Sequence, residues 1–149
     1  MQGIADSTGV LSTRLTGSMT SMTAKFKGLG FGIEDATDLA AKGLYMASDA
    51  AAFCDVSLDE SMGHLNSFIN GSYEGGEAIG LFANDTQMAA YAVEKGIVSE
   101  TKAWANLDEA TKQATRLDYA QWMLDNSGAT GQAAREADQY ANTQANLAE

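Results

Sequence analysis

No proline occurs in the 149 residues of the chain, and apolar side chains recur at helical spacing instead. Met19, Met22, Phe26 and Leu29 stand three or four residues apart, which places them on one face of a helix. Proline is the strongest interruption to a helix, and loops and sheet edges commonly use it. Alanine is abundant and runs of β-branched residues are missing. The sequence therefore predicts an all-α fold, a compact bundle of five to seven helices joined by glycine-rich turns.

The length of the chain limits its domain organisation, and its net charge limits its possible partners. The 149 residues suffice for one helical domain, 1–149, in which 1–17 and 132–149 are expected to pack loosely. The chain begins and ends in polar, helix-compatible sequence, so we expect it to be a fragment of a longer protein. A net charge of −11 repels polyanions, which argues against direct nucleic-acid binding. Its apolar runs fall short of the about 20 residues that cross a bilayer, so no membrane association is expected.

A stripe of small residues dominates the predicted helix from about Glu34 to Phe53. Small side chains at this spacing let another helix approach closely, while larger residues seven apart, Leu39, Met46 and Phe53, fill the adjacent groove. We interpret this segment as a central helix clasped on two sides, and Cys54 as a small core residue. The predicted packing and interaction residues are Ala36, Ala40, Gly43, Ala47, Ala50 and Phe53.

Three glycines, Gly28, Gly30 and Gly32, precede this helix. A dinucleotide-binding phosphate loop would follow a strand and open a helix. Here the glycines follow a helical pattern with two lysines in its last turn, where a terminating glycine is typical. The pattern favours a hinge between two helices.

Further helix starts are predicted at two capping boxes, in which Ser57 pairs with Glu60 and Asn106 pairs with Glu109. Asn84 resembles another cap. Residues 73–82 are expected to form a short helix or loop over the preceding helix, and 97–98 are the only plausible strand.

Chemistry-bearing motifs are scarce. His64 is the only histidine and has no HExxH pattern, and GxSxG, CxxC, Walker and calcium-loop patterns are missing. We therefore expect no enzymatic activity, no catalytic residue, no metal and no cofactor. Two acids distant in the sequence could still meet in a cleft, as in a glycosidase, so a hydrolase remains an alternative.

The order of short motifs resembles a conserved region of phage tail tape measure proteins. The resemblance runs from about Ser18 to Leu147, and two features depart from it: a looser segment at 72–76 and the absence of an arginine-rich piece after it. The motifs that carry it are Ser21–Ala24 with Leu29–Gly30, Ser48–Phe53, Val56–Ser61, Leu65–Gly71, Ala78–Leu81 followed by Asp85–Gln87, a tyrosine-alanine helix ending at Gly96–Ile97, Leu107–Ala110, and Asn126–Gln132 before a polar helix.

This resemblance implies a structural domain of a phage or prophage tail protein that acts in tail length determination, tail assembly and DNA ejection. It implies the tail tube, tail chaperone and tail tip proteins as partners, together with self-association. It places the chain in the virion tail lumen, and in the host cytoplasm during assembly. The alternatives left open are a tail-associated peptidoglycan hydrolase domain and a helical secreted effector or adaptor.

Overall fold

The computed structural model describes residues 17–138, and within this range helices form where the apolar spacing predicts them. The all-α prediction is confirmed, because these residues form helices and turns and no strand. Residues 97–98, the predicted strand, lie in an irregular link. The helical segments are 17–28, α2 (Ile33–Cys54), α3 (Leu58–Ile69), η1 (Tyr73–Ile79), α4 (Asp85–Glu94), η2 (Thr101–Asn106), α5 (Glu109–Ser127) and 132–138.

The described residues form eight helical segments, above the predicted five to seven. The segment without a predicted counterpart is η2, because a short helix or loop is already expected over 73–82, where η1 forms. η2 is a 3₁₀ helix of six residues, too short to give the amphipathic signal of an α-helix. The prediction of loose packing falls mainly on 1–16 and 139–149, outside the described residues. In the described part of the segment 132–149, residues 132–138 are helical and residues 134–138 are exposed.

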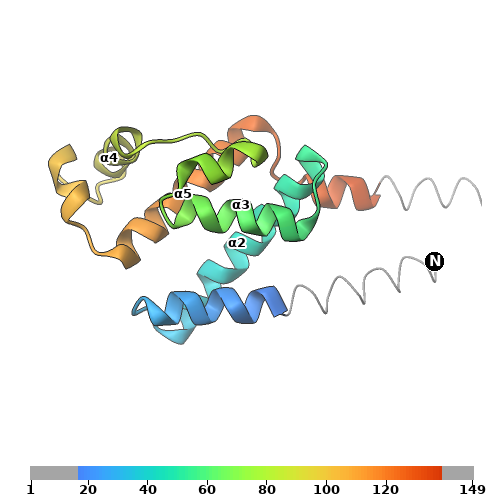
Figure 1. Cartoon of the computed structure of the whole chain (residues 1–149), viewed down its shortest axis with the longest axis horizontal. Coiled ribbons are helices and arrows are strands. Elements are labelled where there is room, and N and C mark those ends of the chain that lie inside the picture. The colour runs from blue at the N-terminus through green and yellow to red at the C-terminus, as the bar shows by residue number, and fades with distance from the viewer. Residues whose placement is uncertain (1–16, 139–149) are drawn as a thin grey trace, which may run out of the picture.

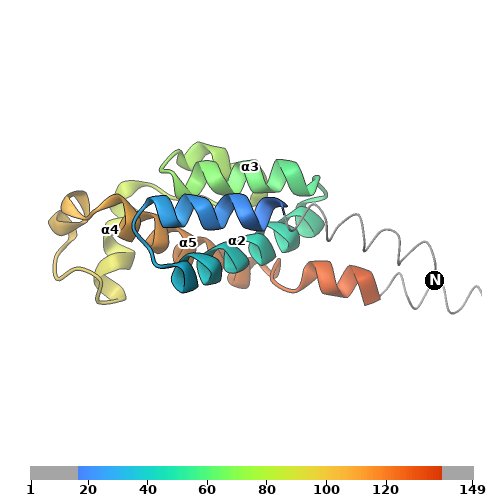
Figure 2. The same cartoon turned by 90° about the horizontal axis from the view of Figure 1, so that it is seen from below.

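The helices are arranged around α2, which contacts both α3 and α5 (Figures 1 and 2). η1 packs on α3, while α4 and η2 pack on each other, and α4 also contacts α5. In both views the N-terminal end of the first helix and the last described helix lie toward the same end of the molecule. Within residues 17–138, no helix has both the length and the apolar character that crossing a bilayer requires.

The turn between the first helix and α2 contains the three predicted glycines. Gly28 ends the first helix, and Gly30 adopts a φ of +110°, which a residue with a side chain rarely adopts. The amide of Phe31 then donates to the carbonyl of Phe26 at 3.2 Å. Gly32 is the N-cap of α2, with extended backbone and no side-chain cap. The glycines thus lie in a turn that follows a helix.

η1 lies against α3 because Gly76 leaves room for the ring of Phe68. A Cβ built at Gly76 would stand 2.9 Å from both Phe68 Cδ2 and Leu81 Cβ. Neither neighbour is the free end of a flexible side chain, since Phe68 and Leu81 are both fully buried. Gly63 on α3 is the opposite case, with nothing within 4 Å of its built Cβ.

This pair gives a test of the η1–α3 packing. Gly76→Ala is expected to destabilise the fold by about 1–3 kcal/mol, because the added methyl overpacks the core. Gly63→Ala adds the same methyl at an open helical position and should stabilise by about 0.8–1 kcal/mol. Urea denaturation of both variants measures the difference. Equal stabilities for the two would contradict the close contact.

Candidate functional site at the packing face of α2

The packing face of α2 is the surface formed by Ala36, Ala40, Gly43, Ala47 and Ala50, and each of these residues is buried. At Gly43, a built Cβ would lie 2.6 Å from Cε of Met22 and 3.8 Å from Cδ1 of Leu117. Met22 belongs to the first helix and Leu117 to α5. Two helices therefore approach α2 at this position, and the contact lies within one chain.

The expectation that Phe53 packs with this face is wrong, because its side chain is 47% exposed. Met46, seven residues earlier, is 1% exposed, and Leu39 packs partly against the core. A strict seven-residue line drifts around a straight α-helix by about 20° per heptad. Phe53 lies at the end of this line and in the last turn of α2, so it faces outward.

A serine joins α3 to α2, which the sequence reasoning did not identify. The hydroxyl of fully buried Ser61 donates to the carbonyl of Ala47 at 2.7 Å. Ser61 shares its helical face with Leu65 and Phe68, both buried. Its position on an apolar face is the sequence feature that could have predicted its burial.

Two of the predicted N-caps are confirmed. Oγ of Ser57 accepts from the amide of Glu60 at 3.1 Å, and Oδ1 of Asn84 accepts from the amide of Gln87 at 2.8 Å. Each satisfies a first-turn amide that has no partner inside its helix.

The predicted cap at Asn106 is wrong. Asn106 is the last residue of η2, and the next two residues have extended backbone, so α5 starts only at Glu109. Asp108 is the N-cap, and its carboxylate accepts from the amide of Thr111 at 2.9 Å. Hydrogen bonds from Thr111 lower the pKa of Asp108. Glu109 does not close a capping box with Asn106, because its carboxylate accepts from Gln113 and Arg116.

Arg116 is a buried cation, 6% exposed, on the face of α5 that meets α3, and its side chain reaches Tyr73 of η1. Its Nη1 donates to the carbonyl of Ile69 at 3.0 Å and to the carboxylate of Glu109 at 3.2 Å. Its Nε donates to the hydroxyl of Tyr73 at 3.2 Å. The end of α3 is thus held by a charged donor fork that a shorter or single-point cation could not reproduce.

The same cluster extends to α4 and η2. The hydroxyl of Tyr73 donates to Asp85 at 2.7 Å, and the guanidinium of Arg116 lies 5.7 Å from the ring centre of Trp104. Nε1 of Trp104 faces the same Asp85 oxygen at 3.4 Å. Burial and the hydrogen bond to Asp85 raise the pKa of Tyr73 to about 12, so the phenol stays protonated as the donor.

Asp118 joins α5 to α2 and α4. Its carboxylate accepts from Nζ of Lys42 at 3.0 Å and from the hydroxyl of Tyr91 at 2.5 Å. Partial burial opposes ionisation, but these two hydrogen bonds outweigh it and lower the pKa of Asp118. Burial, with the bond to Asp118, raises the pKa of Tyr91 well above its usual range. The carboxylate is therefore ionised and the phenol neutral at pH 7.

A carboxylate on α2 also fixes the last described helix. Asp49 accepts from the amides of Gly131 and Ala133, at 2.9 Å and 3.1 Å. This is an N-cap supplied from another helix, so residues 131–133 dock on α2.

The remaining chemistry-bearing groups are placed apart. Nδ1 of His64 donates to the carbonyl of Gly75 at 2.8 Å, which ties α3 to η1. Burial raises the pKa of the half-buried Cys54 thiol, which disfavours the reactive thiolate. Across residues 17–138, no three His, Cys, Asp or Glu residues come together in a way that could hold a metal ion.

Comparison with protein-family models, with curated proteins and with solved structures finds no match to this chain.

The Arg116 cluster gives a second test. Arg116→Met keeps most of the buried volume but leaves the carbonyl of Ile69 and the carboxylate of Glu109 without their donor, so we expect a loss of about 3–5 kcal/mol in the free energy of unfolding. Arg116→Lys keeps the charge but not the fork and should recover only part of this loss. Thermal and urea unfolding measure both. A lysine variant as stable as the unmodified chain would contradict the role of the guanidinium fork, because a single positive charge would then be enough to hold the end of α3.

Proposed function

We propose that this chain is a non-enzymatic helical domain of a phage or prophage tail tape measure protein. The proposal rests first on the ordered motif series from Ser18 to Leu147. It is supported by a fold in which the strongly held polar groups, such as Arg116 and Asp118, bind other helices of the same chain. The proposed role is tail length determination, assembly and DNA ejection, in the tail lumen. The proposed partners are the tail tube, tail chaperone and tail tip.

Helical geometry supplies the physical basis for a ruler. An α-helix rises about 1.5 Å per residue, so residue count converts directly to length. The folded bundle, however, is much shorter than the same residues would be as one continuous helix. The longest helix among residues 17–138, α2 with 22 residues, spans about 33 Å. The described residues drawn out as one helix would span about 180 Å. We therefore propose that the bundle is the free form and that it opens into extended helix inside the tail tube.

Tail length tests this proposal directly. In the phage or prophage that encodes the chain, an in-frame deletion of residues 33–127 is expected to shorten tails by about 140 Å in negative-stain images, because that is their length as extended helix. Gly76→Ala is the matched control: it weakens the free bundle without changing residue count, and should leave tail length unchanged.

Two outcomes would contradict the proposal. Tails of unchanged length after the deletion would remove the ruler role, and absence of the chain from purified tails by mass spectrometry would remove the tail assignment. Clearing of a cell-wall zymogram by the purified chain would instead favour the hydrolase alternative.

A further inference from the structure

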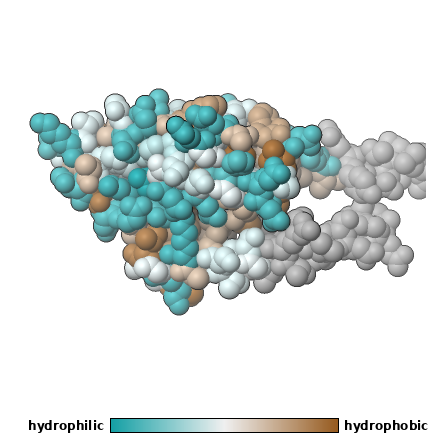
Figure 3. All heavy atoms as spheres, in the orientation of Figure 1, coloured by the Kyte–Doolittle hydropathy of each residue, from teal (hydrophilic) through white to brown (hydrophobic). Residues whose placement is uncertain are grey.

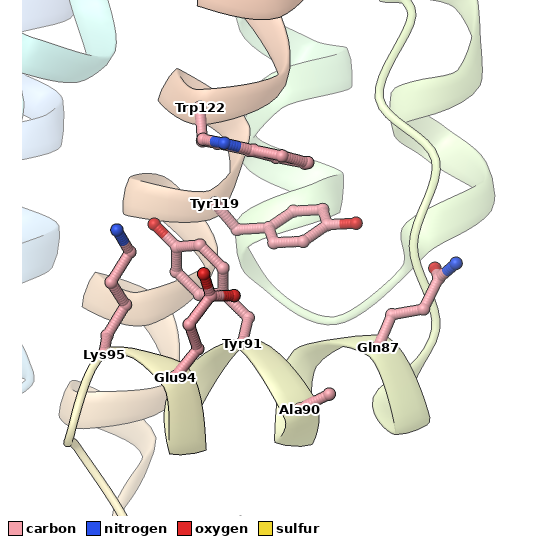
Figure 4. A pocket seen from close by; sticks show the side chains of 7 residues that line it. All are labelled: Gln87, Ala90, Tyr91, Glu94, Lys95, Tyr119 and Trp122. Atoms are coloured by element: carbon pink, nitrogen blue, oxygen red, sulfur yellow. The ribbon is translucent and has the colours of Figure 1, made fainter.

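A solvent-open groove of 230 Å³ lies between α4 and α5, and of its lining side chains only that of Tyr91 takes part in the hydrogen bonds described above. We call it the α4–α5 groove. Figure 4 shows the side chains of α4 along one side and two aromatic rings of α5 along the other. The lining residues are Gln87, Ala90, Tyr91, Glu94, Lys95, Tyr119 and Trp122.

Three aromatic rings form one side and the base of this groove. The ring centres of Tyr119 and Trp122 are 5.6 Å apart, and those of Tyr91 and Tyr119 are 5.1 Å apart. Trp122 is 49% exposed, although the two tyrosines beneath it are 6% and 8% exposed. An aromatic residue held by two others and still open to solvent presents a rigid apolar platform.

Polar groups surround the platform and are free to bind a ligand. The hydroxyl of Tyr119 has no hydrogen-bond partner among residues 17–138, and in Figure 4 it points toward the side of the groove where Gln87 lies. The exposed side chains of Gln87 and Glu94 add an amide and a carboxylate. Together they offer donors and acceptors around an apolar surface, the composition typical of a small-molecule site.

The geometry disfavours a quaternary ammonium ligand, although three aromatics near an acid suggest one. Such a cation needs open space between facing rings. Here the rings contact one another, and Nζ of Lys95 already lies 5.5 Å from the ring centre of Tyr91. Nucleotides and nucleic acids are disfavoured because the chain carries a net charge of −11.

We infer that the α4–α5 groove binds one neutral pyranose ring of a glycan. A pyranose has an apolar C–H face that can lie on the exposed indole of Trp122, and a rim of hydroxyls that can pair with the Tyr119 hydroxyl, Gln87 and Glu94. The volume is below the about 300–1,000 Å³ of sites for drug-sized ligands, which suits a single ring. The inference does not depend on the proposed tail function.

The indole N–H signals of the two tryptophans provide the test, with the whole chain titrated by chitotriose and by cellotriose in ¹H–¹⁵N spectra. Saturable shifts of the Trp122 signal are expected for at least one sugar, with a dissociation constant in the millimolar range typical of a small, open site. The signal of Trp104, which is 4% exposed, should stay in place. No shift of Trp122 with either sugar would overturn the inference, as would tighter binding of choline or adenosine at the same residues.

Calorimetric titration of variants distinguishes sugar binding in the α4–α5 groove from non-specific binding elsewhere on the surface. Trp122→Ala should weaken sugar binding at least about tenfold, by loss of the stacking surface. Tyr119→Phe removes one unpaired hydroxyl, so it should weaken binding while leaving the melting temperature unchanged, and it keeps the test valid if Trp122→Ala unfolds. Tyr45→Ala removes a 74% exposed aromatic from α2 and should leave affinity unchanged. Unchanged affinity in the first two variants would overturn the inference.

Discussion

Close approach of helices to α2 depends on the lack of side-chain bulk along its packing face. At Gly43 the first helix and α5 both reach the backbone of α2, through Met22 and Leu117. A helical glycine costs about 1 kcal/mol relative to alanine, so here the packing of its neighbours must offset that cost. Once α5 lies against α2, its polar side chains are in position: Arg116 then reaches α3 and η1, and Asp118 reaches Lys42 and Tyr91.

Features that depend on short-range patterns could be predicted from the sequence. The small-residue stripe follows from helical periodicity alone. Its first five members are buried, and its last, Cys54, is half-buried. The caps at Ser57 and Asn84 follow from a side chain that meets an amide three residues on. The turn at Gly28–Gly32 follows from glycine placed after a helical pattern, and Gly30 has the expected positive φ. In the caps and the turn the interacting groups are close in sequence, so tertiary structure changes little. For the stripe only the helical periodicity is local, because its partners at Gly43, Met22 and Leu117, lie in other helices.

Features that depend on distant partners could not be predicted. Arg116 meets a carbonyl 47 residues away, and Asp49 caps amides more than 80 residues away, so no local pattern marks either one. The capping box at Asn106, predicted from a local motif, is wrong. Asn106 is part of η2, and Asp108, two residues later, is the N-cap of α5 instead. The α4–α5 groove needs α4 and α5 side by side before Tyr119 and Trp122 acquire their polar surroundings.

The packing of the first helix and α5 against α2 is tested most directly by the short proton–proton contacts at Gly43 in solution. In a sample that mixes isotope-labelled and unlabelled chain, we expect nuclear Overhauser effects from the α-protons of Gly43 to the methyls of Met22 and Leu117 within one labelled chain. Isotope-filtered spectra, which select contacts between different copies, should lack them. Contacts that appear only in the filtered spectra would show that the packing face of α2 joins separate chains, and would contradict the account.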